Sequence, residues 1–324
     1  MITIETPKFR FQPRIIASQN EDIRYKGSSG GIITHITKYL FESTQINTAV
    51  SFRFTGVELF KPYLIYNFDQ YNQTGSIYHE INIYNFLLDN LSAIKSPLLV
   101  TCLPCQAKPV RVLCKRFNIE VILISLVCST QLEKQATYYF LKNNSINVSD
   151  LDEFRYRGNG WPSGIEAKVF GKAHFFKNNN SKWQDIFHSQ IFSMTRCLFC
   201  TNTFGENADL SVADPWLKRY IKNDKIGSSI VIAHSDLGNT LISSMLLENH
   251  LRLIENLSID ETILSQKDTL IRKVIFRKYS KLVLFMVKLI RTDFYKKYFF
   301  RISSLHNFIL YKILGILKRI EGLK

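Results

Sequence analysis

Three parts of the chain share one pattern, in which a short apolar run is followed by a turn and then by helical spacing. Apolar runs of this length are typical of buried strands, and the order strand–turn–helix indicates an α/β fold with helices packed on a sheet. The expected strands are 96–101, 121–127 and 229–233, and the expected helices are 110–117, 133–142 and about 239–249.

The N-terminal third extends the same picture. Residues 15–18 fit a strand followed by a turn, residues 47–66 alternate as strands do, and residues 84–92 have helical spacing. We therefore predict an α/β fold built on a mixed sheet flanked by helices, with a helical C-terminal tail. In such folds ligands gather at the carboxyl ends of the strands.

A glycine-rich loop, Ser28-Ser29-Gly30-Gly31, runs directly into a helical pattern that begins at Ile32. Such a loop exposes backbone N–H groups at the positive end of the helix dipole, which suits a phosphate or the pyrophosphate of a flavin. An ordinary serine N-cap with flexible glycines explains the same pattern. The sequence alone leaves both interpretations open.

The chain has 324 residues, of which 46% are hydrophobic, so it is long enough for one large globular domain or one and a half. No apolar run reaches the roughly 18 residues that span a bilayer, and the N-terminus lacks the apolar region of a signal peptide. We therefore expect a cytoplasmic protein, in which cysteines stay reduced.

The net charge of +15 is concentrated at the C-terminal end. Residues 272–324 contain fourteen Lys and Arg against two acids, which is +12, so the rest of the chain carries only +3. We predict a globular core over 1–265 and a basic helical tail over 266–324. One face of the tail is apolar and is formed by Ile302, Leu305, Ile309, Ile313, Ile316 and Ile320. This face fits an anionic membrane surface, a partner protein or the chain's own core.

The six cysteines offer several kinds of site. Cys114 falls inside an apolar helical pattern and is typical of a small buried residue. The pairs Cys102/Cys105 and Cys197/Cys200 have the C-x-x-C spacing of zinc sites, iron–sulfur sites and redox dithiols. Cys105 and Cys128 each end an expected strand and precede an expected helix, whose dipole favours a thiolate.

Two segments carry further candidate side chains. Residues 154–162 contain two arginines, two glycines and Trp161, which we expect to be exposed, and residues 209–216 are rich in aspartate. We take Arg157, Trp161 and Asp214 as candidate contacts to a substrate or a planar ring. A turn with a packing tryptophan is the simpler interpretation of the first segment.

Taken in order, these motifs resemble the coenzyme F-420 hydrogenase/dehydrogenase beta-subunit family of flavin and iron–sulfur oxidoreductases. The resemblance covers about 13–236. It rests on SSGG-x-x-T (28–34), G-S-x-Y (75–78), P-C-Q (104–106), the lone Cys128, an F-R-x-R/G-x-G-W segment, and C-x-x-C-x(8)-AD-[IL]-S-x-x-D-x-W from Cys197.

The resemblance implies specific site residues. It makes Cys105, Cys128, Cys197 and Cys200 the ligands of one 4Fe–4S cluster and leaves Cys102 spare. It also implies a bound flavin, expected to be FAD. The implied flavin residues are Ser28, Ser29, Gly30, Gly31, Thr34, Ser76 and Tyr78.

The sequence departs from the family at three places. Relatives often carry an N-terminal ferredoxin-like module, for which we see no room before Arg24, so we expect an external ferredoxin or electron-transfer subunit as a partner. Relatives often have Cys-His-Gly where this chain has Cys128-Ser-Thr, and glycine where it has Ala213. Short relatives with a basic tail resemble proteins associated with bacterial surface-polysaccharide synthesis.

The resulting hypothesis is a flavin-dependent oxidoreductase that passes electrons between a 4Fe–4S cluster, FAD and a hydride donor or acceptor. That molecule is either the deazaflavin coenzyme or a glycan or polyprenyl-linked compound. The alternative is a zinc-stabilised, non-catalytic accessory protein of a membrane-associated glycan-assembly complex. Nucleic-acid binding is suggested by charge alone and is not expected, because no basic loop has interleaved aromatic residues.

Overall fold

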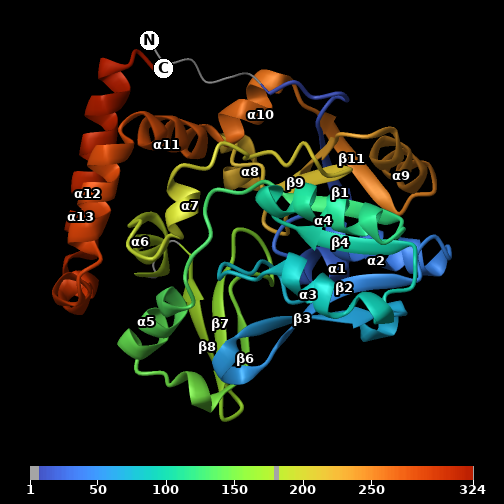
Figure 1. Cartoon of the computed structure of the whole chain (residues 1–324), viewed down its shortest axis with the longest axis horizontal. Helices are drawn as coiled ribbons and strands as arrows, with labels where there is room; N and C mark the ends of the chain where they lie inside the picture. Colours follow the sequence, from blue (N-terminus) through green and yellow to red (C-terminus); the bar gives the residue numbers. More distant parts are fainter. Residues whose placement is uncertain (1–6, 179–181, 324) are drawn as a thin grey trace.

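The computed structural model describes residues 7–178 and 182–323, and its largest element is a mixed sheet of eight strands (Figure 1). The strand order is β11-β1-β10-β9-β5-β4-β2-β3. The strands are β1 (Arg14–Ser18), β2 (Thr48–Phe54), β3 (Phe60–Ile65), β4 (Leu98–Cys102), β5 (Val121–Leu126), β9 (Leu210–Ala213), β10 (Ser229–Ala233) and β11 (Leu251–Asn256).

The four central strands β2, β4, β5 and β9 run parallel, and the strands on either side of them run antiparallel. The carboxyl ends of β4, β5 and β9 therefore lie at one edge of the sheet. Cys105, Cys128 and Asp214 follow these three ends along the chain.

Both faces of the sheet are covered by helices. Successive residues of a strand point to opposite faces, so each buried strand packs against helices on both sides. Leu99 of β4 packs in a cluster with α2 and α9, whereas Leu98 and Val100 pack in a second cluster with α3 and α4. The helices of the N-terminal two thirds of the chain are α1 (Glu21–Lys26), α2 (Ile32–Glu42), α3 (Ile83–Asp89), α4 (Pro104–Arg116), α5 (Gln135–Asn143), α6 (Lys182–His188), α7 (Thr195–Leu198) and α8 (Lys218–Asn223).

A second sheet has three antiparallel strands in the order β6-β7-β8. It consists of β6 (Leu151–Arg155), β7 (Gly164–Val169) and β8 (Lys172–Lys177). With α5 and α6 it encloses an aromatic cluster around Phe140, Tyr156 and Trp183.

The C-terminal part of the chain is helical and packs on the rest of the molecule. Its helices are α9 (Asp236–Leu247), α10 (Ile259–Ser265), α11 (Lys267–Lys278), α12 (Ser280–Ile290) and α13 (Asp293–Ile320). α12 and α13 form one outer edge, at the left of Figure 1 and on the side opposite α9. Across the described part of the chain, no helix combines the length and the apolarity needed to cross a bilayer.

The predicted fold class is confirmed, and the predicted strands and helices lie where the apolar pattern placed them. Two local predictions were wrong. The segment after β1 is the short helix α1 and not a turn, because Asn20 caps it by accepting from the Ile23 N–H. The small sheet was not anticipated, and residues 151–155, whose end we had assigned to a turn, form its first strand.

Candidate functional site

Cys105 stands in the first turn of α4, directly after β4. Pro104 occupies the first helical position, where its missing N–H costs nothing. The Gln106 side chain accepts from the Leu103 N–H (3.0 Å) and donates to the Ile81 carbonyl (2.6 Å). Gln106 thus fixes the start of the helix, and Cys105 itself is exposed.

Cys128 lies in an irregular segment after β5. Its N–H donates to the Thr203 carbonyl (3.0 Å), and its own carbonyl accepts from Lys273 Nζ (2.8 Å). The helix expected over 133–142 is α5 (Gln135–Asn143), so an irregular segment separates it from this cysteine. The backbone in between pairs with other segments instead, through bridges from Leu132.

Cys197 and Cys200 lie in and just after the short helix α7. Asn202 joins this loop to the start of α4, because its side chain donates to the Pro104 carbonyl (3.0 Å) and accepts from the Gly205 N–H (3.2 Å). The Cys200 thiol donates to the Asn202 carbonyl (3.5 Å). The C-x-x-C segment is therefore held directly against the segment that carries Cys105.

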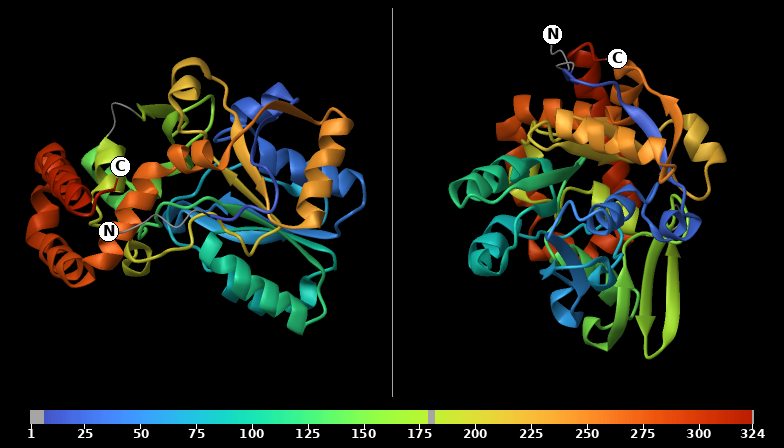
Figure 2. Two further views of the ribbon diagram at one scale, coloured as in Figure 1. Left: turned by 90° about the horizontal axis from the view of Figure 1, so that it is seen from above. Right: turned by 90° about the vertical axis from the view of Figure 1, so that its right-hand side faces the viewer.

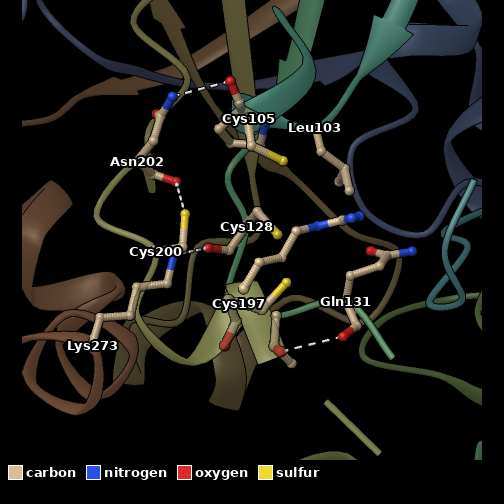
Figure 3. A pocket seen from close by; sticks show the side chains of 12 residues that line it. Leu103, Cys105, Cys128, Gln131, Cys197, Cys200, Asn202 and Lys273 are labelled. Atoms are coloured by element: carbon tan, nitrogen blue, oxygen red, sulfur yellow. Dashed lines mark hydrogen bonds between the residues drawn. The ribbon is translucent and has the colours of Figure 1, made fainter. Parts of the chain in front are cut away.

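These four cysteines line one pocket, although they come from segments up to 95 residues apart (Figure 3). Its other lining residues are Leu103, Pro104, Ser129, Thr130, Gln131, Arg196, Asn202 and Lys273. The remaining cysteines, Cys102 and Cys114, are buried in the apolar cluster between the sheet and helices α3 and α4. The pocket thus contains the four cysteines that the family resemblance selects and leaves out Cys102.

Two cationic side chains of α11, which were not among the predicted site residues, contact the segment that carries Cys128, and one of them, Lys273, lines the pocket. Besides its bond to Cys128, Lys273 Nζ donates to Thr203 Oγ1 (3.1 Å). Arg272 donates to the carbonyl (2.9 Å) and the hydroxyl (3.0 Å) of Ser129. Burial lowers the pKa of Lys273 and the pKa of Arg272, while the nearby thiols act in the opposite direction. Arg272 and Lys273 are buried, whereas most other basic residues of the tail are exposed. The sequence alone does not distinguish them from those surface residues.

The pocket affects the pKa values of its thiols. Burial raises the pKa of Cys105, and neighbouring Cys200 and Cys197 raise it further. Burial likewise raises the pKa of Cys128 to about 12, against the opposing effect of Lys273. Both thiols are therefore protonated at neutral pH unless a bound metal displaces the protons.

Within the described residues, no group of three or more His, Cys, Asp or Glu side chains is placed to hold a single metal ion. A zinc ion requires all four sulfurs at about 2.3 Å from one centre. The four thiols of the pocket come from three separate segments (Figure 3), and cysteines scattered in this way are common ligands of iron–sulfur clusters.

The SSGG and GSxY loops lie side by side. The Ser76 N–H donates to Ser28 Oγ (2.6 Å), and the Ser28 carbonyl accepts from Arg157 Nη2 (2.6 Å). Gly75 has a φ of +73°, and a Cβ there would lie 2.3 Å from the Arg157 carbonyl oxygen. Glycine is therefore required where this loop meets Arg157.

The other flavin candidates point in different directions. The Ser29 hydroxyl is bonded to the Ser228 carbonyl, and the Gly30 N–H donates to Ser229 Oγ (2.9 Å), so both are tied to the start of β10. Gly31, at φ +73°, begins α2 without a side-chain cap. Thr34 Oγ1 lies 3.4 Å from the Tyr71 hydroxyl, and the Tyr78 ring packs edge-on against Tyr156 with centroids 5.3 Å apart. Six of the seven candidates thus lie in or beside the start of α2, whereas Tyr78 packs in the aromatic cluster of the small sheet.

Arg157, Trp161 and Asp214 form one buried network. Arg157 Nη1 and Nη2 lie 2.6 and 3.1 Å from the two carboxylate oxygens of Asp214, and Trp161 Nε1 donates to Asp214 Oδ1 (3.2 Å). Burial acts to lower the pKa of Arg157, but Asp214 outweighs it and raises the pKa above its ordinary value. The expectation that Trp161 is exposed was wrong: it is 3% exposed, while Trp216, whose ring centroid is 5.2 Å away, is the one that reaches solvent.

Comparison with known proteins points to one family. The model of the coenzyme F420 hydrogenase/dehydrogenase beta-subunit N-terminal region matches residues 15–87, and the model of its C-terminal region matches residues 96–256. Among solved structures, a chain of the xenon-derivatised F420-reducing NiFe hydrogenase complex from Methanosarcina barkeri is similar. It has a TM-score of 0.62 and 14% identity, over 84% of this chain and 93% of that chain. A search of curated proteins gives no match.

Both family regions match in order, together they take in every cysteine of the pocket, and the similar structure shares the fold. The predicted resemblance is therefore confirmed. This chain belongs to the coenzyme F420 hydrogenase/dehydrogenase beta-subunit family, a family of oxidoreductase subunits.

Proposed function

We propose that this chain is a flavin and iron–sulfur oxidoreductase subunit in which Cys105, Cys128, Cys197 and Cys200 bind one 4Fe–4S cluster. The observation that carries the proposal is the single pocket lined by these four thiols and by Lys273. Cysteine thiolates are the usual ligands of such clusters, and ligands scattered along a chain are common for clusters built into larger enzymes.

The side chains around the pocket fit a group of negative overall charge. Four thiolates bring four negative charges, and the Lys273 ammonium and the Arg272 guanidinium lie next to the backbone that carries Cys128. Cations near the sulfurs favour the reduced, more negative form of a cluster and thus raise its reduction potential. Lys273 and Arg272 also fix the position of the Cys128–Ser129 segment by direct hydrogen bonds.

The exposed side of the pocket suits electron exchange with another protein. Cys105 and Arg196 are exposed, whereas Cys197 is buried. An electron carrier can therefore approach the cluster from the Cys105 side. We propose an external ferredoxin or electron-transfer subunit as this partner.

The start of α2 fits the anionic part of a flavin, proposed to be FAD. The first backbone N–H groups of a helix have no partner within it, and α2 has no side-chain cap to satisfy them. The candidates Ser28, Ser29, Gly30, Gly31, Thr34 and Ser76 lie in or beside this end, and the glycines are also required by close backbone packing. The seventh candidate, Tyr78, lies in the aromatic cluster of the small sheet. Bound flavin and cluster together allow a two-electron hydride reaction to be coupled to one-electron transfer.

Helix α11 connects the two proposed cofactor regions. Gln266, at its N-terminus, donates to the Asp214 carbonyl (3.0 Å), and Lys273 contacts Cys128. Seven residues of helix rise by roughly 10 Å, so two turns of α11 join the Arg157–Asp214 network to the cysteine pocket. The network holds the Ser28 loop through Arg157 and so positions the proposed flavin site.

The proposed hydride donor or acceptor is the deazaflavin coenzyme named in the family description or a glycan or polyprenyl-linked compound of surface-polysaccharide synthesis. The family assignment supports the first, and the basic tail supports the second. We propose that the reaction takes place on the cytoplasmic side of the membrane. Reduction of each compound by the reconstituted protein with a chemical reductant distinguishes them.

The cluster is tested by purifying the protein without oxygen. We expect a brown protein with about four irons and four acid-labile sulfides per chain, and one equivalent of flavin released on denaturation. If iron and sulfide are found without flavin, the proposed cluster stands and the proposed flavin site is refuted. A colourless protein with one zinc and no flavin would refute the proposal in favour of a zinc-stabilised accessory protein.

Single alanine substitutions assign the ligands. Cys105→Ala is expected to lose most of the iron, because it removes an exposed ligand without disturbing the core. Cys114→Ala is the matched control, since this cysteine lies on the same helix but in the apolar cluster, and iron content should not change. Equal iron content in the two variants would contradict the assignment.

A further inference from the structure

Helix α13 is turned so that polar side chains face the core. Ser303 Oγ donates to Asp185 Oδ2 (2.6 Å), Asn307 Nδ2 donates to the Asp185 carbonyl (3.0 Å), and His306 Nε2 lies 3.0 Å from the Ser189 carbonyl oxygen. All three are buried, and the same face carries the buried Phe299. The inner face thus combines these hydrogen bonds with apolar packing. Phe299, Tyr295 and Phe300 join the aromatic cluster, and Leu314 and Leu317 pack against the C-terminal helices.

The outer face of the same helix is apolar. Exposed apolar residues follow one another at intervals of three or four, with one interval of seven between Ile309 and Ile316, so they lie on one side of the helix. Leu305 and its neighbour Phe308 are each 58% exposed. The stripe itself consists of Phe294, Tyr298, Ile302, Leu305, Ile309, Ile316 and Ile320. A soluble amphipathic helix has the reverse orientation, with its apolar stripe inward.

Helix α12 extends this apolar surface. It packs beside α13 and exposes Phe285 and Leu289. The two helices form the outer edge of the molecule, away from the eight-stranded sheet, in Figure 1 and in the left view of Figure 2. Phe285 and Leu289 are 68% and 63% exposed.

The surface is also strongly basic. Exposed cations lie along the apolar stripe at Lys297, Arg301, Lys312 and Arg319. Of the two acids after residue 271, Glu321 is buried and paired with Lys278 (2.7 Å), which leaves Asp293 at the beginning of α13. The outward face thus combines exposed apolar side chains with positive charge along its whole length.

We propose that the outward face of α12 and α13 lies on an anionic membrane surface. The stripe from Phe294 to Ile320 spans 26 residues, or roughly 39 Å, and a helix of this kind lies in the plane of the interface with its apolar side chains among the acyl chains. The flanking lysines and arginines then reach the anionic headgroups. A second copy of this chain is a poor occupant, because it would bring an equally positive face.

Vesicle sedimentation with the full-length protein tests this proposal. We expect binding to vesicles with about one third phosphatidylglycerol at least tenfold stronger than to pure phosphatidylcholine vesicles, and weaker binding as salt is raised. The double variant L305E/F308E should lose at least tenfold in affinity for the anionic vesicles. This experiment does not depend on the cofactors, so its outcome is separate from that of the proposed function.

The matched control is the double variant L237E/L247E, which makes the same change of charge at two exposed leucines of α9 (49% and 83% exposed), on the opposite side of the molecule (Figure 1). Its binding should be reduced less than twofold. Circular dichroism and thermal unfolding verify that each variant is folded.

Three results would overturn the proposal. The first is no binding to anionic vesicles, and the second is an equal loss of binding in the L305E/F308E and L237E/L247E variants. The third is a stable dimer in the unsubstituted protein that L305E/F308E dissociates, which would assign this face to a second copy of the chain.

Discussion

Neutralising Asp214 tests whether the buried pair with Arg157 stabilises the fold as its geometry implies. The two side chains are 7% and 15% exposed and make a two-point contact, which Trp161 extends. Asp214→Asn preserves the size of the side chain but removes its charge. The guanidinium of Arg157 then remains buried without a counter-charge.

Breaking a buried ion pair by removing one partner costs 3–5 kcal/mol. The asparagine oxygen can still accept one hydrogen bond, so we expect about 3 kcal/mol for Asp214→Asn. At about 2–4 °C per kcal/mol for a chain of this size class, the unfolding midpoint should fall by roughly 6–12 °C. Urea unfolding followed by circular dichroism measures the free energy directly.

Two further variants separate this cost from other effects. Asp236→Asn makes the same change in an ion pair with Arg10 whose side chains are 73% and 57% exposed, so it should cost less than about 1 kcal/mol. The double variant R157M/D214L removes both charges, and we expect it to recover at least half of the loss, because no unpaired charge remains. The reasoning is refuted if Asp214→Asn costs no more than Asp236→Asn, or if the double variant is as unstable as the sum of its single substitutions.

Two other predictions concern backbone sterics and pH. Gly75 and Gly56 have φ values of +73° and +72°, but a Cβ at Gly75 would lie 2.3 Å from a carbonyl oxygen, whereas at Gly56 it meets nothing within 4 Å. Gly56→Ala should therefore cost about 1–2 kcal/mol and Gly75→Ala clearly more, and equal unfolding free energies in urea would contradict this. Burial lowers the pKa of His79 from 6.5 to about 4, and its Nε2 accepts from the Phe60 N–H, so the folded state disfavours the charged ring. Since the unfolded chain then binds the extra proton between pH 6.5 and 4, stability falls as pH falls through this window, by about 2 kcal/mol from pH 7 to 5. His79→Gln should remove that part of the pH dependence, and an unchanged dependence would contradict the assignment.

Much of the large sheet was predictable, because its strands are short apolar runs set apart by turn residues. The expected strand 121–127 is β5 (Val121–Leu126), and 229–233 is β10. The small sheet was not predictable in the same way. Its residues alternate between buried and exposed only in part, and β8 carries charge and histidine among its phenylalanines, so no clear period is present.

The cysteine set shows where local spacing fails. The C-x-x-C pattern of Cys102 and Cys105 pairs two residues that the structure separates, since Cys102 ends β4 inside the apolar cluster and Cys105 lies in α4. The family motifs selected Cys105 and Cys128 instead, and both line the pocket. That these four cysteines bind a cluster is still a prediction.

The sequence by itself determined the elements of the sheet and the motifs that assign the family, because both are local patterns of residues along the chain. The tertiary structure alone decided which side chains meet. It brought Lys273 from the basic tail to Cys128, joined Arg157 to Asp214, buried Trp161, and turned the apolar stripe of α13 outward. Each of these contacts depends on how elements far apart in the chain pack together, and the period of an amphipathic helix does not indicate which of its faces the core covers.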